Sequence, residues 1–463
     1  MQIFNTLTKK KEELKPIHDG EIKMYVCGPT VYSFIHIGNA RPIIVFDTLR
    51  RYLEYSGYNV AYVQNFTDID DKVIRRANEE GITYLDVSNK YINEYFHDAD
   101  SLNVMRSTEN PRATEHIAEI IDLVKTLIDK GHAYPADNGD VYFSVRSYPA
   151  YGKLKGQSID DMESGARIDP TEHKKDPLDF ALWKGAKPGE PSWDSPWGKG
   201  RPGWHIECSA MSMKILGETF DIHAGGVDLI FPHHENEIAQ SEAATGKPFA
   251  NYWMHNGHIN VNNQKMSKSL GNFFTVRDIV KEYEPEVLRL FMLSAHYRSP
   301  FNFSRELMEQ AKASLLRLRT AKERLDTAKT GPASDADSAF MAELSETEKA
   351  FKSAMDDDLN TADALGVIFD FVRKTNTFVT EPRSSEAIEA AKKLFSDMTG
   401  IFGVLLQEKK TEINEDALKL LAERTEARKN KDWAKSDELR DKLKEMGYLV
   451  IDSKDGASLK PIE

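Results

Sequence analysis

The stretch KMYVCGPTVYSFIHIGNARP, residues 23–42, decides the fold that this chain of 463 residues is expected to adopt. Its mostly apolar start, residues 23–27, predicts a short buried strand that a Gly-Pro pair ends. Residues 36–55 then carry apolar side chains at helical spacing, and residues 59–66 form a second β-rich run. A strand, a glycine turn, a helix and a further strand predict the start of a parallel α/β sheet.

The composition, with 40% hydrophobic and 29% charged residues, is typical of a globular protein that buries several cores. A net charge of -13 disfavours a protein that coats polyanions generally, while a local basic patch for nucleic acid stays compatible with it. Two cysteines make no disulfide scaffold, and the N-terminal residues lack the apolar core of a signal peptide. No apolar run approaches the roughly 18 residues that span a bilayer. We therefore expect a soluble, cytoplasmic protein with reduced thiols.

Changes in sequence character divide the chain into six segments. An aromatic-rich stretch with hairpin signals and a Pro/Gly/Trp-rich loop interrupts the α/β pattern, and a long helical region with heptad-like spacing follows it. The expected order is a first half of a Rossmann-like domain (1–125), an insertion (126–200), the second half (201–260), a loop and stem region (261–304), a helical bundle (305–403) and a small C-terminal module (404–463).

The HIGN motif, residues 36–39, lies where a helix begins after the first strand. Free backbone N–H groups and the helix dipole favour an anion there, and Gly38 allows a ligand to approach the backbone closely. The His36 imidazole suits the stabilisation of charge on a transferred phosphate group. Taken alone, the motif fits an ordinary helix start with a satisfied histidine better.

The KMSKS motif, residues 265–269, lies in the Gly/Asn/Lys-rich stretch NVNNQKMSKSLGN. Two lysines beside small hydroxyl residues suit an anionic leaving group such as pyrophosphate, whose charge develops in the transition state. A solvated surface loop is the alternative for five residues alone. HIGN and KMSKS in this order, about 230 residues apart and with an insertion between them, are far more specific. The chain here resembles the class I aminoacyl-tRNA synthetases, whose catalytic fold carries HIGH- and KMSKS-type motifs around ATP.

The two cysteines belong to a candidate metal site. Cys27 ends the first strand, and Cys208 lies in the stretch RPGWHIECSAM. On a helix expected to carry HHENE, His233 and Glu237 stand at i and i+4 on one face, which suits two ligands of one ion. Two sulfurs, one nitrogen and one oxygen make a suitable tetrahedral zinc site.

Two alternatives to this ligand set stay open from spacing alone. His234 and Glu237 stand at i and i+3, which also allows both to bind one ion. Without the other motifs, two buried thiols beside a surface helix would be the simpler interpretation. Pro232 is expected in the first turn of the helix, where its missing N–H costs nothing.

The combined motifs CGPTVY…HIGN, GWHIECSAM, HHENE and KMSKSLGN resemble the cysteinyl-tRNA synthetase family over nearly the whole chain. One departure is Asn39 at the fourth position of HIGN, where an amide donor can replace an imidazole. The resemblance implies activation of L-cysteine by ATP and Mg²⁺ to cysteinyl-AMP, and transfer of cysteine to the 3′ end of tRNA(Cys). It also implies one zinc ion per chain, and it selects His233 over His234 as ligand.

Zinc in such a site explains why a rare cysteine ends the first strand. A zinc ion with an exchangeable position can take the substrate sulfur as thiolate, and serine or alanine offers no such soft ligand. Cysteine is then selected without an editing domain.

The chemistry above and the resemblance together give a set of expected site residues. Trp204 is as readily a core tryptophan, and Gly225, Gly226 and Asp228 line the nucleotide pocket or form a plain turn. The set is His36, Asn39 and Lys268 as catalytic residues; Pro29, His36, Gly38, Asn39, Lys265, Met266, Ser267, Lys268 and Ser269 around ATP; Cys27, Cys208, His233 and Glu237 as zinc ligands; Trp204 and His223 at the substrate pocket; and Trp433, Asp437 and Asp452 toward the anticodon.

The expected partners are tRNA(Cys), L-cysteine and ATP, with no membrane, and a monomer is implied by the resemblance. An excess of Lys and Arg over acids in residues 424–444 fits phosphate contact, although a solvated helix face fits it too. A rival is a ligase that joins cysteine to an amino sugar, as in mycothiol synthesis, for which the C-terminal module has no obvious use. A non-catalytic, zinc-containing RNA-binding protein is disfavoured by the presence of His36 and Lys268.

Overall fold

The computed structural model describes residues 1–163, 173–261, 264–265, 273–406, 415–430, 432–453 and 456–461. The chain forms two compact units, Met1–Leu406 and Gln407–Glu463. Within the described residues, every helix is too short or too polar to cross a membrane.

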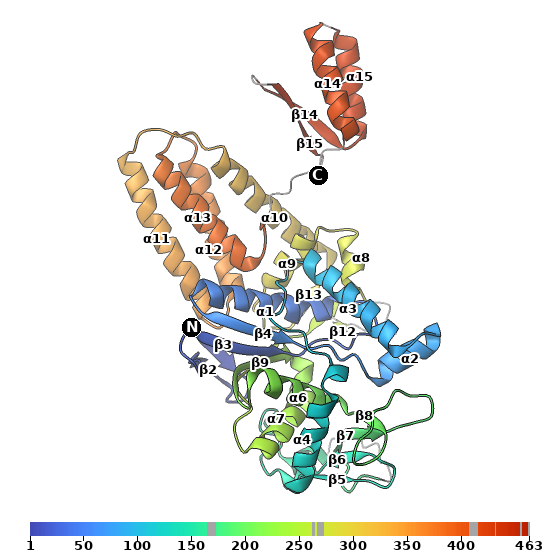
Figure 1. Ribbon diagram of the computed structural model, residues 1–463. Helices are drawn as coiled ribbons and strands as arrows, with labels where there is room; N and C mark the ends of the chain where they lie inside the picture. Colours follow the sequence, from blue (N-terminus) through green and yellow to red (C-terminus); the bar gives the residue numbers. More distant parts are fainter. Residues whose placement is uncertain are drawn as a thin grey trace. The chain divides into compact units, whose positions relative to one another are not determined.

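A sheet of four parallel strands forms the centre of the first unit (Figure 1). The strands are β3 (Glu21–Val26), β4 (Asn59–Gln64), β9 (Phe220–Gly226) and β10 (Ala250–Asn256), in the spatial order β10-β9-β3-β4. In β3, Met24, Tyr25 and Val26 are fully buried, as the apolar run predicts for a parallel strand covered on both faces. The predicted α/β fold is confirmed.

Helices cover both faces of this sheet (Figure 1). Helix α1 (Ile37–Tyr55) covers one face, while α6 (Trp204–Leu216) and α7 (Glu235–Thr245) cover the other. The chain leaves β3 toward β4 and leaves β9 toward β10, so the strand order reverses between β3 and β9. Ligands of open α/β sheets bind beyond the carboxyl ends of the strands at such a reversal.

Pro232 lies in the first turn of the helical segment that continues into α7, as the sequence predicts. The regular helix begins at Glu235, and Phe231 has extended backbone angles (φ -141°, ψ 132°) that interrupt the preceding turn. A residue before proline is pushed out of the α conformation, which explains the break. His233 lies one turn before Glu237, and their side chains meet.

The insertion forms a separate antiparallel sheet after β4. A buried carboxylate connects it to α7: Glu235 accepts hydrogen bonds from the backbone N–H groups of Gly152, Leu154 and Lys155. The elements of this region are α2 (Asp71–Glu80), α3 (Tyr84–Ser101), α4 (Ile117–Asp129), β5 (Ala133–Pro135), β6 (Val141–Phe143), α5 (Ile159–Glu163), β7 (Phe180–Gly185) and β8 (Gly200–Pro202).

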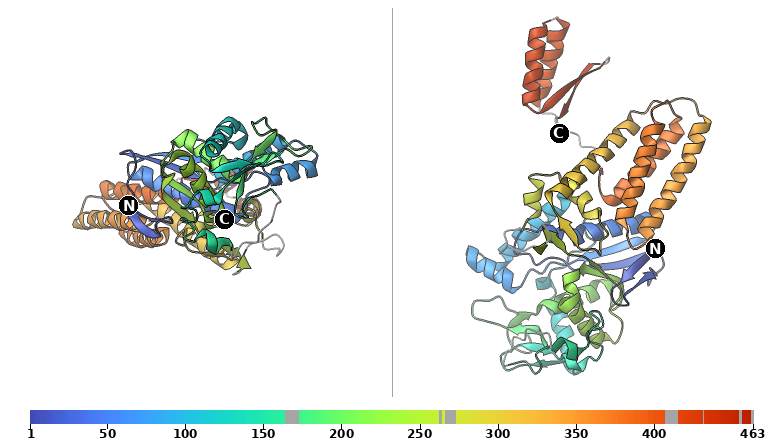
Figure 2. Two further views of the ribbon diagram at one scale, coloured as in Figure 1. Left: turned by 90° about the horizontal axis from the view of Figure 1, so that it is seen from below. Right: turned by 180° about the vertical axis from the view of Figure 1, so that it is seen from behind.

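A helical bundle lies on the α1 side of the central sheet (Figure 2). A buried Arg289 joins it to the α/β core, donating to Asp47 of α1 and, at 2.5 Å, to the carbonyl of Phe402. The bundle helices are α10 (Arg305–Asp326), α11 (Asp335–Asp356), α12 (Thr361–Phe378) and α13 (Ser385–Phe402); the remaining elements of the unit are β1 (Gln2–Asn5), β2 (Lys10–Glu13), β11 (Ile259–Val261), β12 (Gln264–Lys265), α8 (Val276–Val280), α9 (Pro285–Leu293) and β13 (Phe301–Phe303).

The second unit contains two helices and a β-hairpin. Ala417, Leu443 and Leu459 form its small buried core. The second strand of the hairpin is not among the predicted elements, because GASLKP carries little β-branched or aromatic character. The elements are α14 (Glu415–Lys429), α15 (Trp433–Glu445), β14 (Tyr448–Ser453) and β15 (Gly456–Pro461).

Candidate active site and metal centre

The turn after β3 fixes the position of Cys27. The Cys27 N–H donates to the carbonyl of Ala224 at 3.0 Å, which holds the end of β3 against β9. At Gly28 a Cβ atom would lie 1.7 Å from the carbonyl oxygen of Asn65, so no residue with a side chain fits there. The Gly28 N–H also donates to Asn65 Oδ1 at 2.8 Å. The glycine therefore holds the Cys27 thiol at the edge of the sheet.

Four donor atoms converge at this edge. The Cys27 Sγ atom lies 3.9 Å from Cys208 Sγ and 3.7 Å from Glu237 Oε1, and His233 Nε2 lies 3.0 Å from the same carboxylate oxygen. A tetrahedral zinc ion with bonds of about 2.0–2.3 Å has ligand–ligand edges of about 3.3–3.8 Å. The observed separations are close to these edges, so the four side chains fit one zinc ion.

The protonation preferences of these donors also fit a cation. Burial raises the pKa of the Cys27 thiol and of the Glu237 carboxyl, and it lowers the pKa of the His233 imidazole. Burial alone thus favours the neutral form of all three groups. A dication reverses this preference for the thiol and the carboxyl, since thiolate and carboxylate are the forms that bind metal.

A second set of donors lies behind the first. His234 Nε2 is 3.3 Å from Cys27 Sγ, and His223 Nε2 is 2.7 Å from Glu237 Oε2. The first separation lies at the lower end of the range of ligand edges, and the second is a hydrogen-bond length. Cys27, Cys208 and His233 line the adjacent cavity. Among the described residues that line it, His223 and His234 are absent. Their placement is that of outer partners which orient metal ligands.

Further histidines extend this hydrogen-bonding layer. His234 Nδ1 lies 2.8 Å from His255 Nε2, and His255 Nδ1 lies 2.8 Å from Thr6 Oγ1. His205 Nδ1 lies 2.9 Å from His233 Nδ1. Burial lowers the pKa of His205 and of His255 to about 3, so both rings are neutral at physiological pH. If His233 binds metal through Nε2, its Nδ1–H donates to His205, the usual second contact of a metal-bound histidine.

A cavity of about 400 Å³ connects the metal centre with the N-terminus of α1. This volume is in the usual range for small-molecule sites. Trp204 lies at its wall with 38% of its surface exposed, and its ring stacks on His233 with centroids 4.2 Å apart. The core interpretation of Trp204 does not hold. The other expected residues that line the cavity are Pro29, His36, Gly38, Asn39, Gly226 and Asp228.

His36 and Asn39 cap the first turn of α1 reciprocally. His36 Nδ1 accepts a hydrogen bond from the Asn39 backbone N–H at 3.2 Å, and Asn39 Oδ1 accepts one from the His36 N–H at 3.3 Å. This is the capping-box arrangement. An asparagine at the fourth position of the motif therefore has a structural partner, while it also lines the cavity.

Several expected residues are placed only in part. Lys265 belongs to β12, and its side chain and residues 266–269 lie outside the described part of the chain. In the second unit Trp433 is 59% exposed, and Asp437 pairs with Arg440 at 3.2 Å. Asp452 belongs to β14, and its side chain lies outside the described residues.

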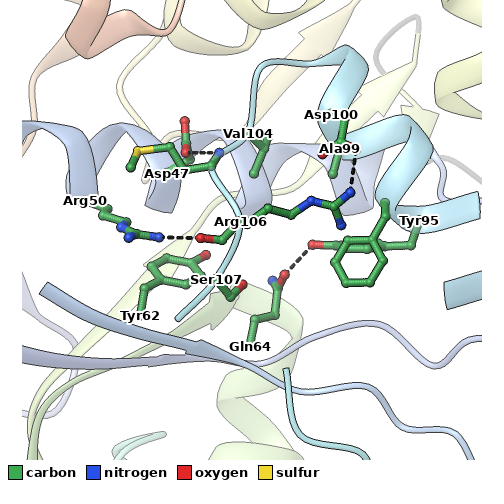
Figure 3. A pocket seen from close by; sticks show the side chains of 12 residues that line it. Asp47, Arg50, Tyr62, Gln64, Tyr95, Ala99, Asp100, Val104, Arg106 and Ser107 are labelled. Atoms are coloured by element: carbon green, nitrogen blue, oxygen red, sulfur yellow. Dashed lines mark hydrogen bonds and ion pairs between the residues drawn. The ribbon is translucent and has the colours of Figure 1, made fainter. Parts of the chain in front are cut away.

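A smaller pocket behind β4 is too small for a substrate (Figure 3). Its volume is about 10 Å³, room for one water at most. The Tyr95 hydroxyl donates to Gln64 across it, and Arg50 donates to the carbonyl of Arg106 at 2.7 Å (Figure 3). The larger cavity is therefore the candidate active site.

Models of known families match most of the chain. A family described as tRNA synthetases class I (C) catalytic domain matches residues 13–313, and a DALR domain matches residues 350–407. A family described as cysteinyl-tRNA ligase anticodon binding domain matches residues 410–457.

Two curated proteins are similar over their whole lengths. A cysteine–tRNA ligase of Caldicellulosiruptor saccharolyticus is 56% identical over 467 residues, with 100% of each chain covered. A cysteine–tRNA ligase of Clostridioides difficile is 54% identical over 466 residues, again with 100% of each covered.

Solved structures of other synthetases share the fold. Mycobacterium tuberculosis methionyl-tRNA synthetase bound by methionyl-adenylate is 14% identical, with a TM-score of 0.60, and the match covers 90% of this chain and 96% of that one. Agrobacterium radiobacter LeuRS, from a ternary complex with tRNA, is 11% identical with a TM-score of 0.59, covering 84% and 85% of the two chains.

Proposed function

This chain belongs to the cysteine–tRNA ligase family of class I aminoacyl-tRNA synthetases, and on that premise we propose that it activates L-cysteine with ATP and Mg²⁺ and transfers it to the 3′ end of tRNA(Cys). One observation carries the proposal beyond the family: a single cavity joins a cluster of metal-binding side chains to the phosphate-binding end of α1. Cysteine bound by its sulfur at the metal-binding cluster would present its carboxylate toward ATP at the N-terminus of α1.

Cys27, Cys208, His233 and Glu237 would hold one zinc ion per chain at the end of this cavity. The ion would bind the substrate sulfur as thiolate, a soft ligand that serine does not offer. Trp204 stacks on His233 and forms the wall beside that position. His223 lies behind Glu237 and holds the carboxylate in place, a role that differs from the expected pocket wall.

The N-terminus of α1 would bind the phosphates of ATP. His36, Gly38 and Asn39 line the cavity at this end, where the helix dipole favours anions. Positioning and stabilisation of developing charge supply most of the catalysis in such a site. Pro29 forms the adjacent wall, and Lys268, Lys265 and the residues between and beside them (Met266, Ser267, Ser269) are proposed to face the pyrophosphate.

The second unit would bind the anticodon region of tRNA(Cys). Exposed Trp433 is suited to stack on an unpaired base, and Asp437 and Asp452 to accept hydrogen bonds from base edges. The match to an anticodon-binding family over residues 410–457 supports tRNA over an amino sugar as acceptor. We further propose that the protein is a cytoplasmic monomer.

Transfer of labelled cysteine onto bulk tRNA, with ATP, magnesium and a reductant, tests this function. Charging that depends on intact tRNA is the expected result. Cysteine-dependent pyrophosphate exchange without charging would instead indicate a ligase with a small amine acceptor. Absence of both reactions from folded, zinc-loaded protein would refute an aminoacylation function.

Substitution of Lys268 tests the proposed phosphate site independently of the proposed zinc site. Lys268→Ala is expected to lower the rate of cysteine-dependent pyrophosphate exchange by about 10²-fold, the usual cost of one charge-stabilising donor. Its zinc content, measured by atomic absorption, should equal that of the wild type. An unchanged exchange rate would remove Lys268 from the proposed phosphate site.

A further inference from the structure

Arg41 and Arg289 are both completely buried, and they differ in what neutralises them. Arg289 pairs with the Asp47 carboxylate. Among the described residues, Arg41 donates only to backbone carbonyls. These are the carbonyls of Gly257 at 2.7 Å, His258 at 3.0 Å and His296 at 3.3 Å. Its guanidinium also lies 5.4 Å from the ring centre of Phe301. None of the carboxylates in the described residues forms an ion pair with it.

This placement of a cation is unfavourable within the fold itself. Arg41 is in the first turns of α1, where the helix dipole already carries positive charge. Burial lowers the pKa of Arg41 to about 10, and the side chain therefore remains charged at neutral pH. A buried charge without a counter-ion costs free energy that an anion nearby would recover.

The surroundings of Arg41 indicate where that anion binds. Asn39 and Pro42 on its own helix line the active-site cavity, and so do Gly257 and His258, whose carbonyls it holds. Arg41 itself is not among the described residues that line the cavity. The guanidinium therefore lies directly behind the wall of the phosphate-binding end.

The backbone that Arg41 holds is tightly packed on its other side. The Gly257 N–H donates to the carbonyl of Tyr297 at 2.8 Å, and a Cβ at residue 257 would lie 2.5 Å from the carbonyl oxygen of Ser299. The His258 carbonyl also accepts from the Phe301 N–H at 2.9 Å. Strand β11, which leads to the KMSKS motif, begins at the next residue. Arg41 thus connects α1 to the start of the antiparallel pair β11 and β12.

We propose that Arg41 is a positioning residue for the nucleotide: its guanidinium fixes the 257–258 backbone against α1, and its charge favours the anionic phosphates in the adjacent cavity. This inference rests on the proposed use of ATP. Arg41 acts through the cavity wall and through its electrostatic field, and touches neither cysteine nor the metal ligands.

The test compares Arg41→Lys, Arg41→Met and Arg289→Lys in the full-length, zinc-loaded protein. Lys keeps the charge but loses the forked hydrogen bonds, and Met loses both. We expect the KM for ATP in pyrophosphate exchange to rise about 10-fold in Arg41→Lys and about 10²-fold in Arg41→Met, in keeping with lost charge-assisted hydrogen bonds. The KM for cysteine and the zinc content should stay at wild-type values.

Arg289→Lys is the matched control, because it alters an equally buried arginine away from the cavity. It should lower the urea midpoint of unfolding and leave the KM for ATP unchanged. An equal rise in the KM for ATP in all three variants, or a rise confined to cysteine, would overturn the proposal. So would misfolding of both Arg41 variants beside a folded Arg289→Lys. Absence of exchange in the wild type would instead count against the proposed function.

Discussion

His233 and His234 are neighbours in sequence and both are buried, with 2% and 0% of their surfaces exposed, yet the structure gives them different tasks. His233 faces the cavity and reaches Glu237 Oε1, whereas His234 lies behind Cys27 and continues to His255. The difference follows from the helix: successive residues point about 100° apart, so only one of the two can face the cavity.

Asparagine substitutions of the two histidines test this division. His233→Asn removes a proposed ligand and should leave the purified protein with little zinc. His234→Asn removes an outer hydrogen bond, and should keep one zinc while weakening its binding about 10–100-fold. Zinc content by atomic absorption, followed by competition with a chelator, distinguishes the two. Retention of zinc by His233→Asn and its loss from His234→Asn would favour the deeper ligand set.

At this scale the sequence predicted the chemistry of the donors better than their surroundings. HHENE placed His233 and Glu237 on one helix face, and the residue types suggested zinc. Nothing local indicated that Thr6 and His255 would meet, because they are 249 positions apart and only the sheet brings them together. Arg41 gave no signal either, since its partners are carbonyls, which any residue carries.

Between elements, the pair formed by Asp47 and Arg289 joins α1 to α9 and to the end of α13. Burial alone would raise the pKa of Asp47, but the positive charges of Arg289 and Arg51 hold it below its ordinary value. A carboxylate with a depressed pKa stabilises the fold above its unfolded pKa of about 3.9, and this contribution is lost as the pH falls through the folded value.

Asp47→Asn should therefore lower the free energy of unfolding by about 3–5 kcal/mol at pH 7, because it leaves Arg289 buried without its partner. The difference from wild type should stay constant down to about pH 5 and shrink below about pH 4, where Asp47 of the unfolded wild-type chain becomes protonated, followed at lower pH by the folded carboxylate. Urea titrations of both proteins across this range provide the measurement. Asp326→Asn, which removes an exposed pair with Lys322, is the control, with an expected cost under about 1 kcal/mol. A deficit that persists unchanged below pH 3 would contradict the assignment.

Element positions followed from the sequence wherever periodicity was strong. The predicted helix over 36–55 is α1 (Ile37–Tyr55), and the run over 59–66 contains β4. Pro232 lies in the first turn of the helical segment that continues into α7, as the sequence predicts, and the extended Phe231 before it is the conformation that proline imposes on its neighbour. β15 was missed because its pairing with β14, and not its own residues, makes it a strand.

For the whole molecule, the division after Leu406 predicts that the two parts have separable roles. The first unit holds the cavity and all four proposed zinc ligands, so a protein truncated after Leu406 should keep cysteine-dependent pyrophosphate exchange. Its kcat/KM for tRNA charging should fall at least about 10-fold, the effect of losing roughly 1.4 kcal/mol of contacts. Pyrophosphate exchange and tRNA charging, measured on the same preparation of the truncated protein and compared with the full-length chain, provide the test. Equal losses in the two would show that the C-terminal module also supports the catalytic core.

The order of the proposed metal ligands along the chain also determines when they can come together during synthesis. Cys27 and Glu237 are 210 positions apart, and β9 must lie beside β3 before their side chains can meet. At roughly 5–20 residues per second, a ribosome needs about 10–40 s to synthesise the chain between them. For most of that interval, until Cys208 is synthesised 181 positions after it, Cys27 is the only thiol on the nascent chain. Loading with the proposed zinc ion would therefore come late in synthesis, after the insertion has emerged and the second half of the sheet has docked.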